Sequence, residues 1–170
     1  LINTYHPQQL TTILREYGEI HNAPKLVTTI LKARTHQPIN TTSQLLELLT
    51  PLAPKQREYK YFAKVFQALR IAVNDELATL QDMLLQIPEL LKPQGRLVIL
   101  SYHSLEDRLI KRFIKTGTFQ GNIIQDTYGN LIRPLKPLHN KPLKPTPQEI
   151  AKNNRARSAR LRTATPEQTL

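Results

Sequence analysis

Cysteine and tryptophan are absent from this chain of 170 residues, and glycine occurs only five times. Without cysteine the chain can form neither a disulfide nor a metal site with thiolate ligands. No apolar run approaches the ~20 residues that a membrane-spanning helix needs, and the first residues show no signal-peptide pattern. We therefore expect a cytoplasmic protein with no resident metal and no membrane partner. The sequence opens with Leu1 rather than methionine, so a targeting segment could have preceded it.

Acidic residues are few compared with basic ones. The chain carries 24 Lys and Arg against 13 Asp and Glu, a net charge of +11, and residues 133–170 alone hold nine basic residues against two acids. A basic tail of this kind favours polyanions such as RNA, because contacts with phosphates release counterions. A solvated or disordered tail would have the same composition, so charge alone leaves both interpretations open.

Residues 66–114 form the stretch around which the rest of the chain is organised. Apolar residues at three- and four-residue steps predict a long amphipathic helix, which Pro88 should kink or force to restart. After a Pro/Gly turn, the apolar run at 97–100 is typical of a strand covered on both faces. A polar loop then leads into a second helix, for which Ser104 and Asp107 can form a capping box. In open helix-flanked sheets, ligands bind just beyond the carboxyl ends of strands, so this loop is a candidate site.

A small helical module precedes this stretch. Capping and stop signals predict helices over residues 7–17, 22–35 and 41–49. A basic connector with aromatic residues, 55–64, follows them. Its aromatics could stack on bases while its cations meet phosphates; alternatively the aromatics pack between two modules and the cations are solvated, which we prefer for Phe62. The residues concerned are Tyr59, Tyr61 and Phe62 with Lys55, Arg57, Lys60 and Lys64.

The sequence signals for helices and strands are weaker in the C-terminal third of the chain. A small hairpin is possible around residues 127–129, and the prolines that follow make regular helix improbable. A short helix could start at Pro147, and residues 158–163 could be the closing strand of the sheet. The last residues, 165–170, should be frayed.

Three long strings resemble one enzyme family. They are VFQALRIAVNDEL at 65–77, SYHSLEDRLIKRF at 101–113 and KPLKPTPQEIAKNNRARSARLR at 141–162. All three are similar to the MraW family, bacterial methyltransferases that modify the exocyclic amine of a cytosine in small-subunit ribosomal RNA. The N-terminal LINTYHPQQLTTILREYGE also fits. One departure lies just before FQALR, where the family commonly has His-Pro-Ala-Thr-Arg and residues 61–64 give no clear match, so no role of that His or Arg carries over.

The resemblance implies a helix-rich α/β fold. Residues 1–58 would be the family's helical insertion, which is thought to help hold the RNA. Residues 59–170 would be the C-terminal part of a Rossmann-like class I methyltransferase domain, with a basic Pro-rich tail over 133–170. Such an enzyme binds S-adenosylmethionine with a Gly-rich turn after its first strand, and none of the five glycines here follows an apolar strand into a helix.

We therefore expect no cofactor-binding residue in this chain. The S-adenosylmethionine site would lie mainly in a missing N-terminal part, and the chain alone would be a catalytically inactive fragment of the enzyme. A partial sheet also leaves an unpaired edge, so a homodimer through that edge is plausible.

The implied reaction is methylation of a cytosine amine in 16S ribosomal RNA, with that RNA or the small ribosomal subunit as the partner. An acceptor for an amine proton would help to localise the nitrogen lone pair, and Ser101, His103 and Asp107 are candidates by position. Capping is the alternative role for Asp107, and a backbone hydrogen bond is the alternative for His103. Candidate RNA contacts are Arg70, Asn74, Arg108, Lys111, Arg155, Arg157 and Arg160.

Other interpretations stay open. Arg70 and Asn74 could belong to a polar helix face with ordinary ion pairs. The chain could be a non-enzymatic basic RNA-binding module, or a structural protein whose basic tail only solvates it. No Ser/His/Asp triad or P-loop is visible, so a hydrolase or a nucleoside triphosphatase has little support.

Overall fold

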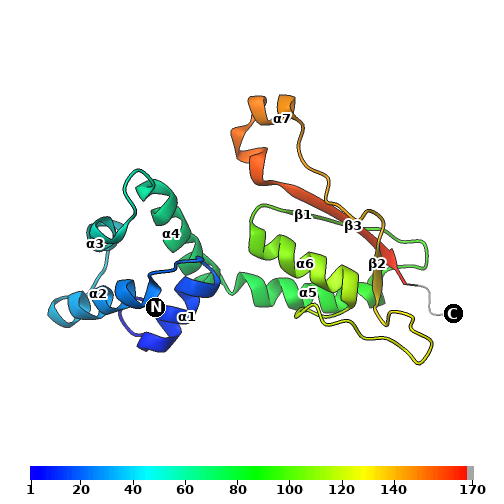
Figure 1. The fold of residues 1–170 in the computed structure, drawn as a ribbon, viewed down its shortest axis with the longest axis horizontal. Helices are drawn as coiled ribbons and strands as arrows, with labels where there is room; N and C mark the ends of the chain where they lie inside the picture. The colour runs from blue at the N-terminus through cyan, green and yellow to red at the C-terminus, as the bar shows by residue number, and fades with distance from the viewer. Residues whose placement is uncertain (168–170) are drawn as a thin grey trace. The chain divides into compact units, whose positions relative to one another are not determined.

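The structure is a computed structural model that describes residues 1–167. The chain divides into two compact units, Leu1–Glu76 and Leu77–Leu170 (Figure 1). Each has its own cluster of buried apolar side chains. Within the described residues, no helix is both long enough and apolar enough to span a membrane.

The first unit is helical, and its first three helices confirm those predicted from the sequence. At the start of the third, the Thr41 hydroxyl accepts a hydrogen bond from the Gln44 N–H at 3.2 Å. The Gln44 side chain accepts one from the Thr41 N–H at 3.0 Å, so the predicted capping box is present. The elements are α1 (Pro7–Glu16), α2 (Ala23–His36), α3 (Thr42–Leu49), the 3-10 turn η1 (Thr50–Leu52) and α4 (Glu58–Asn74).

Helix α4 completes the core of this unit. Its Tyr61 and Val65 are buried in the same cluster as Leu10 and Ile30. Phe62 packs against that cluster, whereas the Tyr59 side chain on the same helix is 88% exposed. Phe62 therefore packs, as preferred, but inside one unit rather than between two modules as expected. The insertion expected over residues 1–58 stays a prediction for the longer protein; here the compact unit extends to Glu76, because α4 supplies part of its core.

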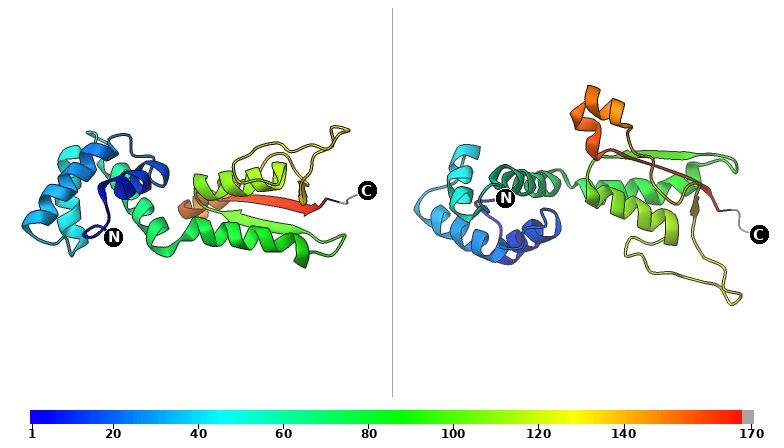
Figure 2. Two further views of the ribbon diagram at one scale, coloured as in Figure 1. Left: turned by 90° about the horizontal axis from the view of Figure 1, so that it is seen from below. Right: turned by 45° about the horizontal axis from the view of Figure 1, so that its top comes forward.

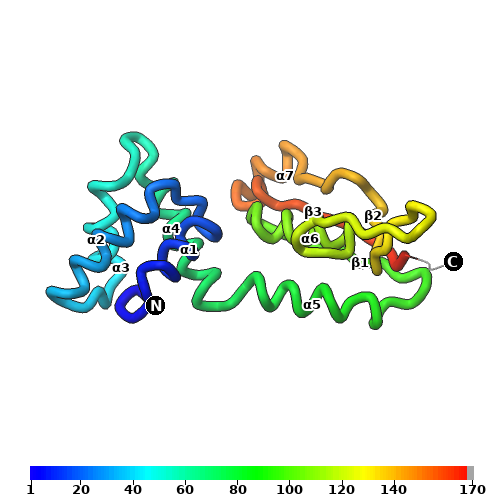
Figure 3. Tube along the Cα trace, turned by 60° about the horizontal axis from the view of Figure 1, so that its bottom comes forward, coloured from blue at the N-terminus to red at the C-terminus, as the bar shows by residue number. Residues whose placement is uncertain are grey.

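The long helix predicted across the middle of the chain is two helices. α4 ends at Asn74, Asp75 adopts a left-handed backbone with φ 51° and ψ 39°, and α5 (Glu76–Leu90) follows at once. Figure 3 traces α5 as one continuous helical run. The helix therefore restarts at Asp75, not at Pro88 as predicted. Pro88 lies in the last turn of α5, where its missing N–H removes one hydrogen bond near the helix end rather than interrupting the helix centre.

The second unit contains a small antiparallel sheet in the order β1-β3-β2. Leu97 pairs with Ala164 and Ser101 with Arg160, so the first and last strands of the chain lie side by side. The predicted closing strand is confirmed, but it extends to Pro166. The fraying predicted at residues 165–166 was therefore wrong. Residues 168–170, for which fraying was also predicted, lie outside the described residues. After α5 the elements are β1 (Leu97–Ser101), α6 (Ser104–Thr116), β2 (Leu135–Pro137), α7 (Pro147–Lys152), the 3-10 turn η2 (Asn154–Ser158) and β3 (Arg160–Pro166).

Helices α5 and α6 lie side by side on one face of this sheet (Figures 1 and 2). Leu84 of α5 is buried with Leu97, and Ile99 packs against the same cluster. Val98 and Leu100 point the other way and are 58% and 50% exposed. The expected cover on both faces was therefore wrong for the described residues, because strand side chains alternate and both helices pack on the same side.

The sheet narrows the fold class expected from the sequence. A helix-rich α/β fold is present, and it is consistent with a fragment of a methyltransferase domain. The described strands are antiparallel rather than doubly wound, so the Rossmann-like arrangement stays a prediction for the longer protein. The predicted hairpin is present as an isolated bridge between Gln125 and Leu131, within the long loop before β2.

Candidate functional site

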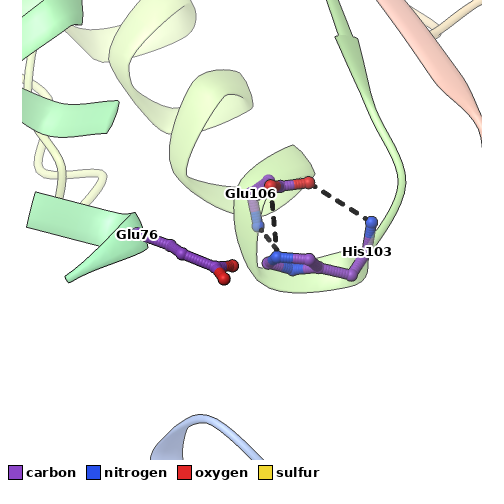
Figure 4. A group of neighbouring side chains, drawn as sticks. All are labelled: Glu76, His103 and Glu106. Atoms are coloured by element: carbon purple, nitrogen blue, oxygen red, sulfur yellow. Dashed lines mark hydrogen bonds and ion pairs between the residues drawn. The ribbon is translucent and has the colours of Figure 1, made fainter. Parts of the chain in front are cut away.

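The turn between β1 and α6 is built by one histidine and one glutamate. His103 precedes α6 with an extended backbone, and its Nδ1 accepts a hydrogen bond from the Glu106 N–H at 3.3 Å. The Glu106 carboxylate accepts from the His103 N–H at 3.4 Å (Figure 4). It also accepts from the Tyr102 N–H, at 3.1 Å. The capping box therefore exists one residue earlier than predicted: Ser104 and Asp107 do not form it, because the helix already begins at Ser104.

The same contacts set the charge of the turn. The hydrogen bond with His103 is the main cause that lowers the pKa of Glu106 below its ordinary value, and the two backbone donors add to it against the opposing effect of burial. The His103 Nε2 also lies 3.2 Å from Glu106 Oε1, and the His103 side chain is 10% exposed. His103 thus has the backbone role that the sequence offered as its alternative.

Asp107 has a different task, because it holds two arginines of β3. Its Oδ1 accepts from Arg162 Nε at 2.6 Å, and its Oδ2 accepts from Arg160 Nη1 at 2.8 Å and from Arg162 Nη2 at 3.2 Å. Asp107 is only 4% exposed. Burial alone would raise the pKa of this carboxyl, but the hydrogen bonds from Arg162 and Arg160 outweigh it, and the pKa lies below its ordinary value.

Ser101 belongs to the sheet rather than to an open loop. It is 3% exposed, and its hydroxyl donates to the Arg160 carbonyl at 3.3 Å, across the ladder between β1 and β3. Ser101 and Asp107 therefore both contact Arg160, one at its backbone and one at its guanidinium. The structure thus brings the candidates Ser101 and Asp107 together around Arg160, which the sequence nominated for RNA binding.

A basic pocket lies beside the Asp107–arginine cluster. This α6–β3 pocket has a volume of about 530 Å³ and is open to solvent. Its charged lining consists of one acid and five cations: Asp107, Lys111, Lys141, Lys144, Arg160 and Arg162. The three lysines are exposed. Such a surface can bind an anion, with the arginine forks held in place and the lysines free to adjust.

The other candidate RNA contacts are spread over the chain. Arg155 and Arg157 lie in η2, and Arg155 lines a separate cavity of about 570 Å³ together with Tyr102 and Lys144. Arg108 is exposed on α6. Arg70 donates to Glu76 at 2.8 and 3.1 Å.

Asn74 donates to the same carboxylate, at 3.2 Å. The polar helix face that the sequence left open is thus present, with an ion pair from Arg70 and a hydrogen bond from Asn74 to Glu76. Binding of RNA by either residue stays a prediction.

Sequence reasoning missed Arg162, Lys141 and Lys144. A usable signal existed for Arg162, because residues two apart on a strand share a face and Arg160 was already a candidate. No local signal could have pointed to Lys141 and Lys144, which reach the pocket from the proline-rich segment before α7.

Comparison with known proteins identifies the family to which the chain is similar. The model of a family described as the MraW methylase family matches residues 1–167. A ribosomal RNA small subunit methyltransferase H from Amoebophilus asiaticus is 52% identical over 162 residues, which are 95% of this chain and 52% of that protein. Proteins of the same name from Cytophaga hutchinsonii and Bacteroides fragilis are 50% and 49% identical, over 98% and 96% of this chain and 56% and 54% of their own lengths. The chain thus spans about half the length of these relatives.

Proposed function

This chain belongs to the MraW methylase family, and on that premise we propose that it is the RNA-holding part of a ribosomal RNA methyltransferase. The substrate would be the exocyclic amine of a cytosine in 16S ribosomal RNA, methylated from S-adenosylmethionine. The observation that carries the proposal is the α6–β3 pocket, where five cations surround one buried carboxylate.

The pocket would bind the RNA backbone. Phosphate oxygens accept hydrogen bonds from guanidinium groups. Arg160 would make this contact, because it donates to Asp107 through Nη1 alone and its side chain is 43% exposed. Arg162 donates to Asp107 through Nε and Nη2 and is 10% exposed, so it would contribute mainly its charge. Lys111 and Lys144 would add mobile charges at the rim. Because backbone contacts position a nucleic acid without reading its sequence, this pocket would fix the register of the RNA rather than select a base.

Ser101, His103 and Asp107 would act as positioning residues in this scheme. Each already has hydrogen-bond partners in the protein, and their side chains are largely buried. They hold the β1–α6 turn and the arginines of β3, from which the RNA would be presented. A direct contact between any of the three and the cytosine amine stays a prediction.

The described residues do not fit a site for S-adenosylmethionine. The turn after β1 is Tyr102-His103, with no glycine whose backbone could approach a cofactor closely. Within residues 1–167, none of the five glycines follows a strand into a helix. We therefore assign no cofactor contact to this chain, and methyl transfer would need the longer form of the protein.

RNA binding across a salt series tests the proposal. Wild-type chain should bind 16S ribosomal RNA with an affinity that falls as salt rises. Lys111→Gln and Lys144→Gln should each weaken binding roughly fivefold at ~0.1 M salt and reduce the salt slope by roughly 0.7, the change expected for one lost phosphate contact on a single strand. Lys92→Gln, an equal charge change at an exposed lysine outside the pocket, is the matched control.

A non-enzymatic RNA-binding module is the second candidate, favoured by the missing glycine turn. Calorimetric titration of S-adenosylmethionine separates the two. No heat with this chain, together with binding and methyl transfer by a form extended at its N-terminus, would support the enzyme. Cofactor binding by neither form would favour the module, and RNA binding without a salt slope would contradict both.

A further inference from the structure

The first unit contains a second basic pocket, of about 450 Å³, between the turn that precedes α2 and the start of α4. We call it the α2–α4 pocket. Part of its lining comes from the basic connector 55–64, for which the sequence left open both RNA contact and simple packing. The residues that matter for its chemistry are Glu19, Asn22, Arg57, Lys60, Tyr61 and Lys64.

Helical spacing brings the cations of this pocket together. Arg57 stands immediately before the first residue of α4, and Lys60 and Lys64 follow it at steps of three and four residues. Tyr61 lies next to Lys60, three residues before Lys64. Positions three, four and seven residues apart share a helix face, so three permanent cations line one wall. The aromatic residue between them is buried, whereas Tyr59 on another face of the helix is not.

The floor of the pocket is held by a chain of hydrogen bonds. The Tyr61 hydroxyl donates to Asn22 Oδ1 at 3.1 Å, and Asn22 Nδ2 donates to the Leu52 carbonyl at 3.2 Å. Burial raises the pKa of the Tyr61 hydroxyl, which keeps it a neutral donor. A ring that is 8% exposed and fixed at its hydroxyl leaves a ligand only a small rigid edge, and it is too buried to act as a platform on which a base stacks.

The opposite wall carries one acid in an unusual backbone conformation. Glu19 has φ 50°, in the left-handed region that few non-glycine residues adopt. From there its carboxylate reaches Lys64 Nζ at 3.6 Å, with both side chains more than one-third exposed. Arg57 and Lys60 make no ion pair with any described residue, so the pocket has two cations that no protein carboxylate neutralises.

We propose that the α2–α4 pocket binds one phosphate-bearing nucleotide of single-stranded RNA. The phosphate would lie against Arg57 and Lys60, and the base or sugar against the fixed edge of Tyr61 and Asn22. A volume of about 450 Å³ is in the range of small-ligand sites, and cations that meet the phosphate backbone are one part of single-strand binding. The identification of the anion as RNA rests on the proposed function.

The first test is RNA binding by pocket variants of the full chain. Arg57→Gln and Lys60→Gln should each weaken binding of a short single-stranded RNA roughly fivefold at ~0.1 M salt, and the double variant should reduce the salt slope by roughly 1.4. Lys32→Gln is the matched control, because Lys32 is exposed on α2 of the same unit and does not line the pocket. Equal effects from Lys32→Gln would mean that only net charge matters, and would overturn the proposal.

Glu19→Gln should change the affinity for RNA in the opposite direction. It removes the carboxylate that pairs with Lys64 and should tighten RNA binding roughly twofold to fivefold, since one more cation is then available to phosphate. If Glu19 served only to hold the fold, Glu19→Gln would weaken RNA binding or leave it unchanged. Circular dichroism of each variant establishes that the helices are intact before binding is compared.

Nuclear magnetic resonance with cytidine 5′-monophosphate separates this pocket from the α6–β3 pocket. We expect the amide signals of residues 19–22 and 57–64 to shift on titration, and Lys60→Gln to require roughly fivefold more nucleotide for the same shifts. If these signals stay unchanged while Lys111→Gln still weakens RNA binding, the inference is wrong and the proposed function stands. If nucleotide binds here but 16S ribosomal RNA is not bound by the chain at all, the proposed function fails instead. An acidic peptide that shifts the same signals as strongly as the nucleotide would overturn the assignment to RNA.

Discussion

In the α6–β3 pocket two of the five cations are held by one buried carboxylate, whereas in the α2–α4 pocket the Glu19–Lys64 ion pair is long, at 3.6 Å, and more than one-third exposed on both sides. Asp107 and Arg162 have side chains only 5% and 10% exposed. A buried charge left without its partner is strongly destabilising, while a surface pair contributes little. The Asp107–arginine cluster is thus part of the architecture of its unit, whereas we expect the Glu19–Lys64 pair to be dispensable for folding of the other unit.

The largest expected effect comes from breaking the buried cluster. Asp107→Asn leaves two guanidinium groups beside a neutral amide, and the free energy of unfolding of this unit should fall by about 3 kcal/mol. Glu19→Gln, which breaks the loose pair of the other unit, should change stability by less than about 1 kcal/mol. Urea unfolding followed by circular dichroism measures both. Equal losses in the two variants would remove the distinction between the pockets.

The pH dependence of stability sharpens the same comparison. The pKa of Asp107 is lowered from 3.8 in the folded protein, so its contribution is fully present above that ordinary value and is lost as the pH falls through the lower folded-state pKa. The urea midpoint of the wild type should therefore drop on acidification below about pH 4.

Asp107→Asn should show a shallower drop over the same range. Some slope should persist in that variant, because the pKa values of Glu106 and Asp126 are lowered as well. If the urea midpoint of Asp107→Asn fell with pH as steeply as that of the wild type, the ion pairs between Asp107 and the arginines would not be the cause of the acid sensitivity.

A smaller effect distinguishes the two possible caps of α6. Because His103 is the residue whose side chain accepts from the first turn, His103→Ala should cost about 1 kcal/mol of stability. Ser104→Ala should change it by less than about 0.5 kcal/mol, although the sequence had nominated Ser104. Thermal unfolding of the two variants side by side is the measurement, and the reverse order would restore the sequence-based assignment.

The smallest expected effect on stability concerns the open sheet, which has no counterpart in the helical first unit. We propose that the free edge of β1, which pairs with no strand among residues 1–167, supports weak self-association. Val98→Lys adds a charge at an exposed position on that strand and should weaken concentration-dependent sedimentation while leaving the fold intact. Sedimentation of the wild type as a monomer at all concentrations would contradict the proposal.

Much of the helical structure could be predicted because its signals are local. Apolar spacing placed α1 to α3 and α6, and the Thr41–Gln44 capping box was predicted from the residues themselves. The break at Asp75 could not be predicted in this way, since aspartate takes a left-handed backbone without the glycine that usually marks it. The outer face of β1 was missed for a similar reason, because a continuous apolar run does not say how many faces of a strand are covered.

In the candidate site, too, local features could be predicted from the sequence and long-range contacts could not. The sequence alone determined the basic character of the chain, the polar turn after the apolar strand and the family to which these strings belong. Only the tertiary structure decided that Asp107 pairs with Arg160 and Arg162, which lie 53 and 55 residues further along the chain. Helix and cap signals act within a few residues, whereas the partner of a buried charge depends on which strand the fold brings beside it.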